Sequence, residues 1–438
     1  MNYRLIYFQL LGCLCYLALA NSSIAEPPTT TDTTAPNWRE HQRQLQREYE
    51  AFRRIYHEES QTQQKKIKAI WGKGEISSKY RWIEYSSDYK QKVIVDFNQH
   101  IIRISRLYRV SDDQPTEAAL LKTVLLKTEK MAFENDQLAQ AVETRVKNRL
   151  TLIKTGSPSD KLFLIAAITG ELSITDENLE RLIDGLIKTR QIKKHVDIEG
   201  TILKTLEFNF EPMQKGKPLY EPILSPEPKK NSQSKDAKKT LSGFFALQPV
   251  IGQELSQEQR KLPNAARAIA PIVSKQAQAL RISEPLIYAT IEAESAFNPF
   301  ARSHVPAFGL MQIVPESAGQ DATSFLFGEA IILTPSYLYN SEKNIEIGTA
   351  YMHLLYYQYL KMIDDPMSRL FCTIAAYNTG TKNVAKAFDK KGNIHKAAKK
   401  INKLSQRQVY DRLIKKLPYK ETKRYLKKVS RLISKYQV

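Results

Sequence analysis

One stretch decides the fold of the C-terminal half: Pro285-Leu-Ile-Tyr-Ala-Thr-Ile-Glu-Ala-Glu-Ser-Ala-Phe-Asn-Pro299, followed by Gly309-Leu-Met-Gln312. Ser283 and Pro285 are typical of a helix start, where serine caps and proline is tolerated in the first turn. Asn298 and Pro299 then stop the helix. The stretch therefore predicts a short apolar helix, and the Gly-Leu-Met-Gln turn after it brings backbone and an amide side chain nearby.

The helix carries a carboxylate on its apolar face. Ile287, Thr290, Ile291 and Glu294 recur at the spacing of one helical face, whereas Glu292 points to roughly the opposite side. Burial on such a face destabilises the charged form and raises the pKa of a carboxyl group, which suits a general acid. The simpler interpretation is a carboxylate paired with a lysine or arginine, as is usual in a basic protein.

The N-terminus indicates export. Arg4 precedes an apolar run that ends near Ala20, and a small-residue cleavage site follows, so residues 1–25 are predicted to be a signal peptide cut after Ala20 or Ala25. The alternative is a lipoprotein signal at Leu10-Leu-Gly-Cys13, which would leave a lipid-modified Cys13. We therefore predict a periplasmic protein, with attachment to the outer membrane through a lipid anchor as the alternative.

The composition excludes some classes of site and partner. The net charge is +20, from 66 basic and 46 acidic residues, but the charges are mixed along helices and no nucleic-acid-binding motif accompanies them. Nucleic acid is therefore not an expected partner. Cys372 is the one cysteine after the signal peptide, so a disulfide and a cysteine metal site are excluded, and a buried apolar role is expected for it. No metal or organic cofactor is expected.

The hydrophobic pattern divides the chain into successive parts. Residues 26–70 are predicted to form a tether and a surface helix, and 71–212 an α+β domain with a small antiparallel sheet. Residues 213–250 form a linker that is rich in proline, lysine and serine. Residues 251–438 read as an all-α domain without a convincing strand. The expected strands are 80–85, 92–97, 100–105 and 200–210, and the expected helices are 38–71, 115–130, 134–152, 175–190, 264–280, 285–297, 344–355, 367–378, 405–417 and 420–436.

Several short motifs occur in one order in the C-terminal domain: Glu294-Ser295, Asn298-Pro299, Ser303, Gly309-Leu-Met-Gln312, Ala376-Tyr-Asn378 and Glu421-Thr-Lys-Arg-Tyr425. This set resembles the Slt-type lytic murein transglycosylases, a goose-lysozyme-like family. The resemblance implies a lysozyme-like catalytic domain over residues 251–438.

The resemblance extends to one branch of that family, the membrane-bound lytic murein transglycosylases C. Residues 85–97 are similar to the N-terminal domain of that branch, and Ser324-Phe-Leu-Phe and 344–351 to its catalytic domain. One departure is Thr379, because the Ala-Tyr-Asn motif is usually followed by two glycines. Thr379 adds a Cβ where the resemblance implies that the backbone approaches substrate, so this residue bears on the width of the groove.

The resemblance implies non-hydrolytic cleavage of the β-1,4 bond between N-acetylmuramic acid and N-acetylglucosamine in peptidoglycan, with 1,6-anhydromuramyl ends as products. Glu294 would be the catalytic acid and base. The implied substrate-binding residues are Ser303, which would donate to the acetamido group or the acid, Met311 and Gln312, which would line the groove, and Tyr377, Asn378 and Tyr425 around Glu294. Two alternatives stay open: a hydrolytic muramidase that uses water, and a non-catalytic protein that binds the cell wall.

Overall fold

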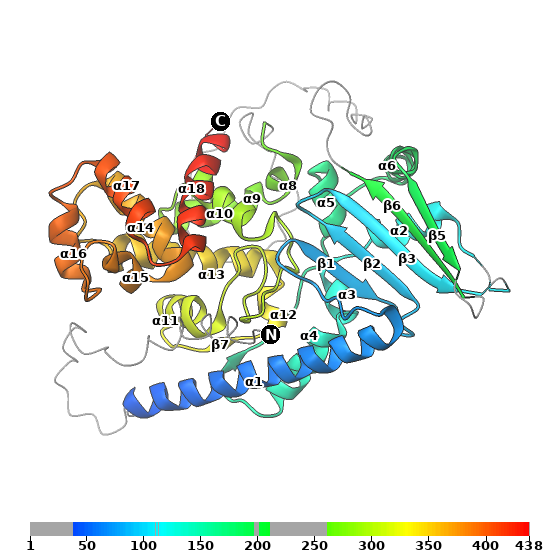
Figure 1. Ribbon diagram of the computed structural model, residues 1–438, viewed down its shortest axis with the longest axis horizontal. Coiled ribbons are helices and arrows are strands. Elements are labelled where there is room, and N and C mark those ends of the chain that lie inside the picture. Colours follow the sequence, from blue (N-terminus) through cyan, green and yellow to red (C-terminus); the bar gives the residue numbers. More distant parts are fainter. Residues whose placement is uncertain (1–37, 110, 113, 197–200, 211–260, 438) are drawn as a thin grey trace, which may run out of the picture. The chain divides into compact units, whose positions relative to one another are not determined.

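The computed structural model describes residues 38–109, 111–112, 114–196, 201–210 and 261–437. The predicted signal peptide, Cys13, the tether before the first helix and the linker at 213–250 lie outside the described residues. The chain forms one compact unit from Leu45 onward. Within that unit we call residues 45–210 the N-terminal region and residues 261–437 the helical region (Figure 1).

The chain's first described element is the long helix α1 (Trp38–Trp71), as the sequence predicts. Its buried residues Leu45, Tyr49, Phe52 and Ile55 recur every three or four positions, so they form one apolar face. This face joins the main core, and Ile67 near the end of the helix packs in a second, smaller cluster.

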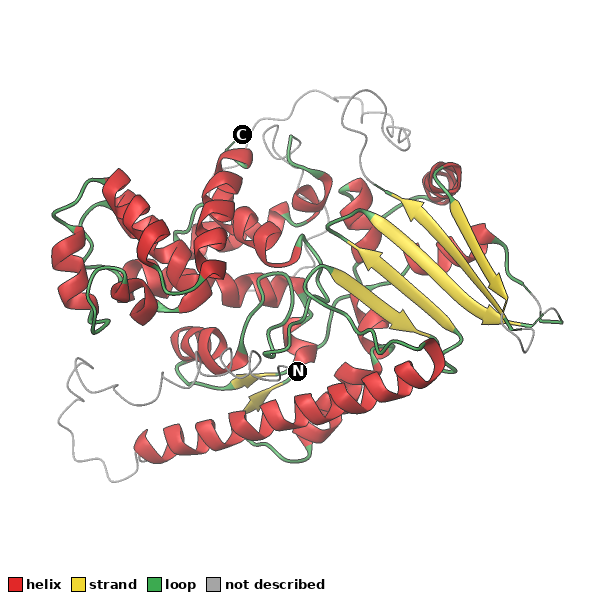
Figure 2. Cartoon of the chain, viewed as in Figure 1, coloured by secondary structure: helices red, strands yellow, loops and turns green. Residues whose placement is uncertain are grey.

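The N-terminal region holds a five-stranded antiparallel sheet in the order β1-β2-β3-β6-β5 (Figure 2). Its strands are β1 (Arg81–Tyr85), β2 (Gln91–Asp96), β3 (Ile101–Tyr108), β5 (Gln191–Val196) and β6 (Ile202–Asn209). Val93 and Val95 face the main core while Ile94 faces the second cluster, which is the alternation of a strand. The predicted α+β fold with an antiparallel sheet is confirmed. The polar edge strand β5, which carries His195, was not predicted.

Five helices accompany this sheet: α2 (Glu117–Leu125), α3 (Glu129–Glu134), α4 (Gln137–Lys147), α5 (Phe163–Thr169) and α6 (Asp176–Lys188). The helix predicted over 115–130 is wrong in its extent. Thr128 accepts a hydrogen bond from the backbone of Met131 and so begins a new helix, α3.

The helical region confirms the predicted all-helical character, with one exception. A two-residue strand, β7 (Ile332–Leu333), pairs in parallel with β4 (Ile153–Lys154) of the N-terminal region. The expected helix 264–280 is two helices, because the chain breaks at Ile269 before Pro271. The helices are α8 (Asn264–Ala268), α9 (Ala270–Leu280), α10 (Glu284–Ser295), α11 (Gln320–Phe327), α12 (Pro335–Leu338), α13 (Ser341–His353), α14 (Pro366–Thr379), α15 (Thr381–Lys386), α16 (Ile394–Ile401), α17 (Gln406–Lys416) and α18 (Lys420–Lys435), with π-helical turns at Pro315–Gly319 and Leu354–Tyr359.

The two regions share one hydrophobic core. Trp82 of β1 and Phe300 of the helical region both pack on Phe163, with ring centroids 5.2 and 5.1 Å away. A buried ion pair between Arg302 and Asp136, 2.6 Å long, adds a polar link. The N-terminal region is therefore part of the scaffold that positions the helical region.

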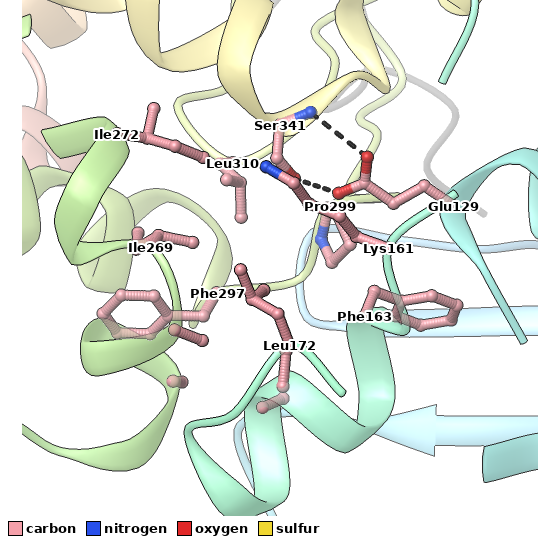
Figure 3. A pocket seen from close by; sticks show the side chains of 14 residues that line it. Glu129, Lys161, Phe163, Leu172, Ile269, Ile272, Phe297, Pro299, Leu310 and Ser341 are labelled. Carbon is pink, nitrogen blue, oxygen red and sulfur yellow. Dashed lines mark hydrogen bonds between the residues drawn. The ribbon is translucent and has the colours of Figure 1, made fainter. Parts of the chain in front are cut away.

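A small apolar pocket also lies between the two regions (Figure 3). Ile269, Ile272 and Leu310 line it from the helical region. The carboxylate of Glu129 lies at its edge and accepts hydrogen bonds from Ser159, at 2.6 Å, and from Ser341. Burial raises the pKa of Glu129, although these hydroxyls oppose the shift. The polar groups at this edge are therefore already satisfied by one another.

Candidate active site

The helix that carries Glu294 is buried on nearly all sides. Of its residues, Ile287, Ile291 and Glu294 are 0, 0 and 6% exposed, so the predicted face is confirmed and the burial extends beyond it. Ser283 occupies the N-cap position, but its side chain makes no capping hydrogen bond. The helix ends at Ser295, earlier than predicted, because Ala296 and Phe297 adopt the left-handed conformation with φ of 50° and 65°.

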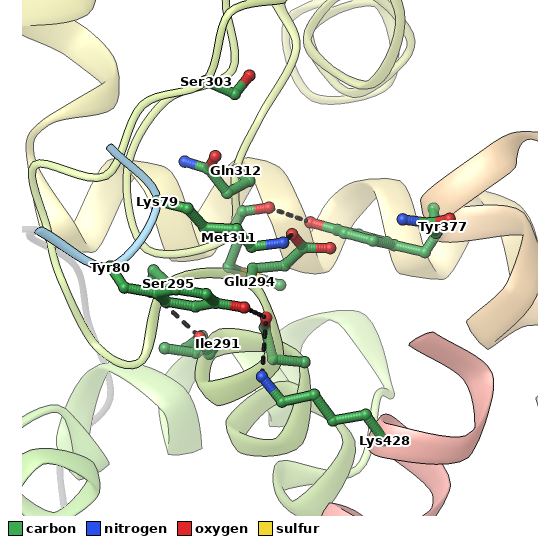
Figure 4. Close-up of polar contacts among 12 residues, drawn as sticks. Lys79, Tyr80, Ile291, Glu294, Ser295, Ser303, Met311, Gln312, Tyr377 and Lys428 are labelled. Atoms are coloured by element: carbon green, nitrogen blue, oxygen red, sulfur yellow. Dashed lines mark hydrogen bonds and ion pairs between the residues drawn. The ribbon is translucent and has the colours of Figure 1, made fainter. Parts of the chain in front are cut away.

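The carboxylate of Glu294 forms an ion pair with a lysine from the N-terminal region. The Nζ atom of Lys79 lies 2.9 Å from Oε2 of Glu294 (Figure 4). Burial acts to lower the pKa of Lys79, but the Glu294 carboxylate outweighs it, so the pKa of Lys79 is raised. Lys79 was not predicted from the sequence, and none of the predicted site residues lies in the N-terminal region.

The C-terminal end of α10 is also held by groups from outside the helix. The carbonyl oxygen of Ala293 accepts hydrogen bonds from the Tyr80 hydroxyl at 3.2 Å and from Nζ of Lys428 at 3.3 Å. The hydroxyl of Ser295 donates to the carbonyl of Ile291 at 3.1 Å. These contacts satisfy carbonyls at the helix end and fix the turn from which Glu294 projects.

The Gly-Leu-Met-Gln turn is held against α13 by Asn344. Its side chain accepts from the backbone of Met311 at 2.8 Å and donates to the carbonyls of Phe308 and Leu338, each at 2.9 Å. Gly309 has φ of +77°, and a Cβ there would lie 2.2 Å from Nδ2 of Asn344, so glycine is required at this position. Asn344 thus positions the turn, whereas in the sequence it stands out only as part of the 344–351 motif.

Three of the predicted site residues gather with Glu294. The hydroxyl of Tyr377 on α14 donates to the carbonyl of Met311 at 2.9 Å, which brings two motifs together. Burial raises the pKa of both Tyr377 and Tyr425 well above 10, and the nearby Glu294 carboxylate adds to each shift. Both tyrosines are therefore neutral near the acid, where they are suited to hydrogen bonding.

The other three predicted residues make contacts of their own. Ser303 donates to the carbonyl of Val305, and its side chain points away from the Glu294 carboxylate in Figure 4. Gln312 donates through Nε2 to the carbonyl of Gly309 at 3.2 Å. Asn378 accepts from the hydroxyl of Thr422 at 2.7 Å. None of these three contacts reaches Glu294.

Three other carboxylates occur near the motifs. Glu292 points away from Glu294, as predicted, and contacts Lys435 at 2.8 Å and the Tyr436 hydroxyl at the far end of α18. Burial raises the pKa of Glu316, and burial raises the pKa of Asp321 to about 6. Neither residue forms an ion pair or hydrogen bond with Glu294 among the contacts of the described chain. Among the described residues, no three histidine, cysteine or acidic side chains are grouped as a metal site would require.

Asp321→Asn is expected to stabilise the protein at pH 7.5 but hardly at pH 4. The folded state holds the pKa of Asp321 above its ordinary value of 3.8, at about 6. Wild-type stability is therefore lost as the pH rises between these values, and the amide avoids that loss. The free energy of unfolding, measured in urea at both pH values, should differ between variant and wild type by about 1–3 kcal/mol at pH 7.5. An equal difference at both pH values would contradict this account.

The chain matches two protein families. Residues 271–401 match the family described as Transglycosylase SLT domain, and residues 46–151 match Membrane-bound lytic murein transglycosylase C, N-terminal domain. Glu294, Ser303, Met311, Gln312, Tyr377 and Asn378 fall inside the first match, whereas Lys79 falls inside the second. The family resemblance is confirmed.

Curated relatives are named membrane-bound lytic murein transglycosylase C, as in the description of the second family. Membrane-bound lytic murein transglycosylase C from Haemophilus influenzae (strain PittEE) is 38% identical over 173 residues, which cover 40% of this chain and 48% of the relative. The protein of that name from Actinobacillus pleuropneumoniae serotype 5b is 40% identical, over 39% of this chain and 46% of the relative. The chain thus spans about half the length of the curated relatives it matches.

The chain is also similar to solved structures. An inactive mutant of lytic transglycosylase Slt from Pseudomonas aeruginosa and the 70 kDa soluble lytic transglycosylase from Escherichia coli are each 23% identical with a TM-score of 0.30. They cover 40% of this chain, and 26% and 25% of their own chains.

Proposed function

We propose that the protein is a peptidoglycan lytic transglycosylase, which cleaves the β-1,4 bond between N-acetylmuramic acid and N-acetylglucosamine without water. The observation that carries the proposal is the buried Glu294 on α10, which lies within the segment that matches the transglycosylase SLT domain. A second carboxylate is not needed, because this substrate can supply the other reacting groups itself.

In the proposed reaction, Glu294 alone carries out both proton transfers. Protonated Glu294 gives its proton to the glycosidic oxygen as the bond from that oxygen to C1 of the muramic acid breaks. The carbonyl oxygen of the 2-acetamido group bonds to C1 and spreads the positive charge. The 6-hydroxyl oxygen attacks C1 and displaces the acetamido oxygen, and its proton passes to the Glu294 carboxylate. The acid is restored, and the product ends in a 1,6-anhydro ring.

The surrounding residues take supporting roles in this proposal. The neutral hydroxyl of Tyr425 orients Glu294, and Tyr377 fixes the turn that carries Met311 through its bond to the Met311 carbonyl. Met311 and Gln312 border the sugar site. Ser303 and Asn378 would bind substrate only after leaving the internal partners described above.

The cellular setting is part of the proposal. The substrate is peptidoglycan glycan strands, and the chain acts in the periplasm, with attachment to the outer membrane if Cys13 carries lipid. The curated relatives are named membrane-bound. No helix in the described part of the chain has the length and apolar character needed to cross a bilayer.

Product analysis tests the proposal. The purified mature chain is incubated with peptidoglycan, and the soluble products are identified by mass spectrometry. We expect muropeptides with anhydro ends, which are one water lighter than hydrolysis products. Reducing ends would instead favour the muramidase alternative with the same Glu294, while binding without any release would favour the non-catalytic alternative.

A further inference from the structure

The segment Ser78-Lys79-Tyr80 leads into β1 and contacts the end of α10, although none of its residues belongs to the predicted site. The side chain of Lys79 is 31% exposed and that of Glu294 is 7% exposed, so this is a partly buried ion pair between residues 215 positions apart. Pairs of this kind are worth more than exposed surface pairs, because water screens them less.

The segment is fixed on both sides. The backbone nitrogen of Ser78 donates to the carbonyl of Arg81 at 2.8 Å, and the carbonyl of Tyr80 accepts from Phe97 at 2.9 Å. On the other side, the Tyr80 hydroxyl donates to Ala293, one residue before Glu294. The segment that carries Lys79 is therefore fixed to the N-terminal region by its backbone and to α10 by the Tyr80 hydroxyl. These contacts place Lys79 beside Glu294.

Other charged and titratable groups surround the pair, but they act differently. Lys428 of α18 contacts the carbonyl of Ala293 and the ring of Tyr80. The negative charge of Glu421, also on α18, acts to raise the pKa of Lys79. Tyr377 of α14 and Tyr425 of α18 face the carboxylate as neutral hydroxyls.

Helix α9 also packs against α10, near the N-terminal end of α10, where the hydroxyl of Ser274 donates a hydrogen bond to the carboxylate of Glu284. Within the described part of the chain, the cation that forms an ion pair with Glu294 is Lys79.

We propose that Lys79 is a positioning residue for this active site: its ammonium group holds Oε2 of Glu294 and so fixes the direction in which the carboxyl group projects. The inference rests on the proposed function and deepens it. In that reaction Glu294 gives a proton to the glycosidic oxygen and takes one from the 6-hydroxyl. A carboxyl group held in one direction serves both transfers, because each needs its oxygen within hydrogen-bond reach of the reacting atom.

The test compares initial rates of product release for wild type, Lys79→Met, Lys79→Arg and Lys275→Met. Without the ammonium group the Glu294 side chain loses its fixed direction, so kcat should fall roughly tenfold in Lys79→Met while KM changes little. Lys79→Arg keeps a cation at this position and should restore most of kcat. Lys275→Met removes a lysine of the helical region that is 66% exposed, and its kcat should stay near the wild-type value.

A second readout needs no turnover. Carboxyl carbon NMR of the folded chain at one pH, with the Glu294 signal assigned by its loss in Glu294→Gln, should show that signal displaced in Lys79→Met and near its wild-type position in Lys79→Arg. An unmoved signal, or a change in KM alone, would overturn the role of Lys79. If the signal moves while wild type releases no product, the proposed function fails and the role of Lys79 stands.

Discussion

Glu294→Gln is expected to lower kcat for muropeptide release by about 100- to 10,000-fold, the usual contribution of general acid–base catalysis. The amide keeps the size of the side chain but can neither protonate the glycosidic oxygen nor accept the proton of the 6-hydroxyl. Both steps lose their proton carrier. Initial rates on soluble glycan strands, with anhydro ends quantified by mass spectrometry, measure the effect.

The matched control is Glu292→Gln. It makes the same chemical change two residues away on α10, but Glu292 faces Lys435 at the far end of α18. Its kcat should stay within a few-fold of the wild-type value. Substantial activity in Glu294→Gln would contradict the assignment of the acid. An equal loss in both variants would mean that the helix, rather than the carboxylate, was damaged, which circular dichroism and thermal unfolding would reveal.

The hydrophobic pattern of the sequence predicted those parts of the site that lie within a single helix or strand. The spacing of Ile287, Ile291 and Glu294 is a property of a single helix, and the burial of all three agrees with it. The first three strands were predictable for the same reason, since the turn at Asp96 is local: its carboxylate accepts from the backbone of Asn98 and Gln99.

Contacts between distant segments could not be predicted in this way. Lys79 sits in a short polar segment before β1, and nothing around it distinguishes it from the many other lysines of a basic chain. The same holds for Asn344, whose amide anchors the turn at Met311 from another helix. The parallel pair of β4 and β7 has two residues on each side, which is too short for a periodic signal. Tertiary packing decides all three.

Arg302→Met is expected to lower the free energy of unfolding by about 3–5 kcal/mol, the usual cost of leaving one member of a buried ion pair alone. Arg302 and Asp136 are joined at 2.6 Å, and their side chains are 4% and 7% exposed. Burial acts to lower the pKa of Arg302, but Asp136 outweighs it, so the pKa is raised and the guanidinium stays charged. Without it, the buried carboxylate of Asp136 loses its counter-ion. Urea denaturation at neutral pH measures the loss.

The double variant Arg302→Met with Asp136→Asn separates the lost pair from the stranded charge. Asparagine can still accept from the backbone of Ala139, where Asp136 caps α4, but it carries no charge. The double variant should therefore be more stable than Arg302→Met alone. Lys275→Met is the surface control, because Lys275 and Glu342 form a pair of similar length, 3.0 Å, with side chains 66% and 43% exposed. Its effect should stay below about 1 kcal/mol. An equal loss in Arg302→Met and Lys275→Met would show that the buried pair does not hold the N-terminal region to the loop between α10 and the Met311 turn.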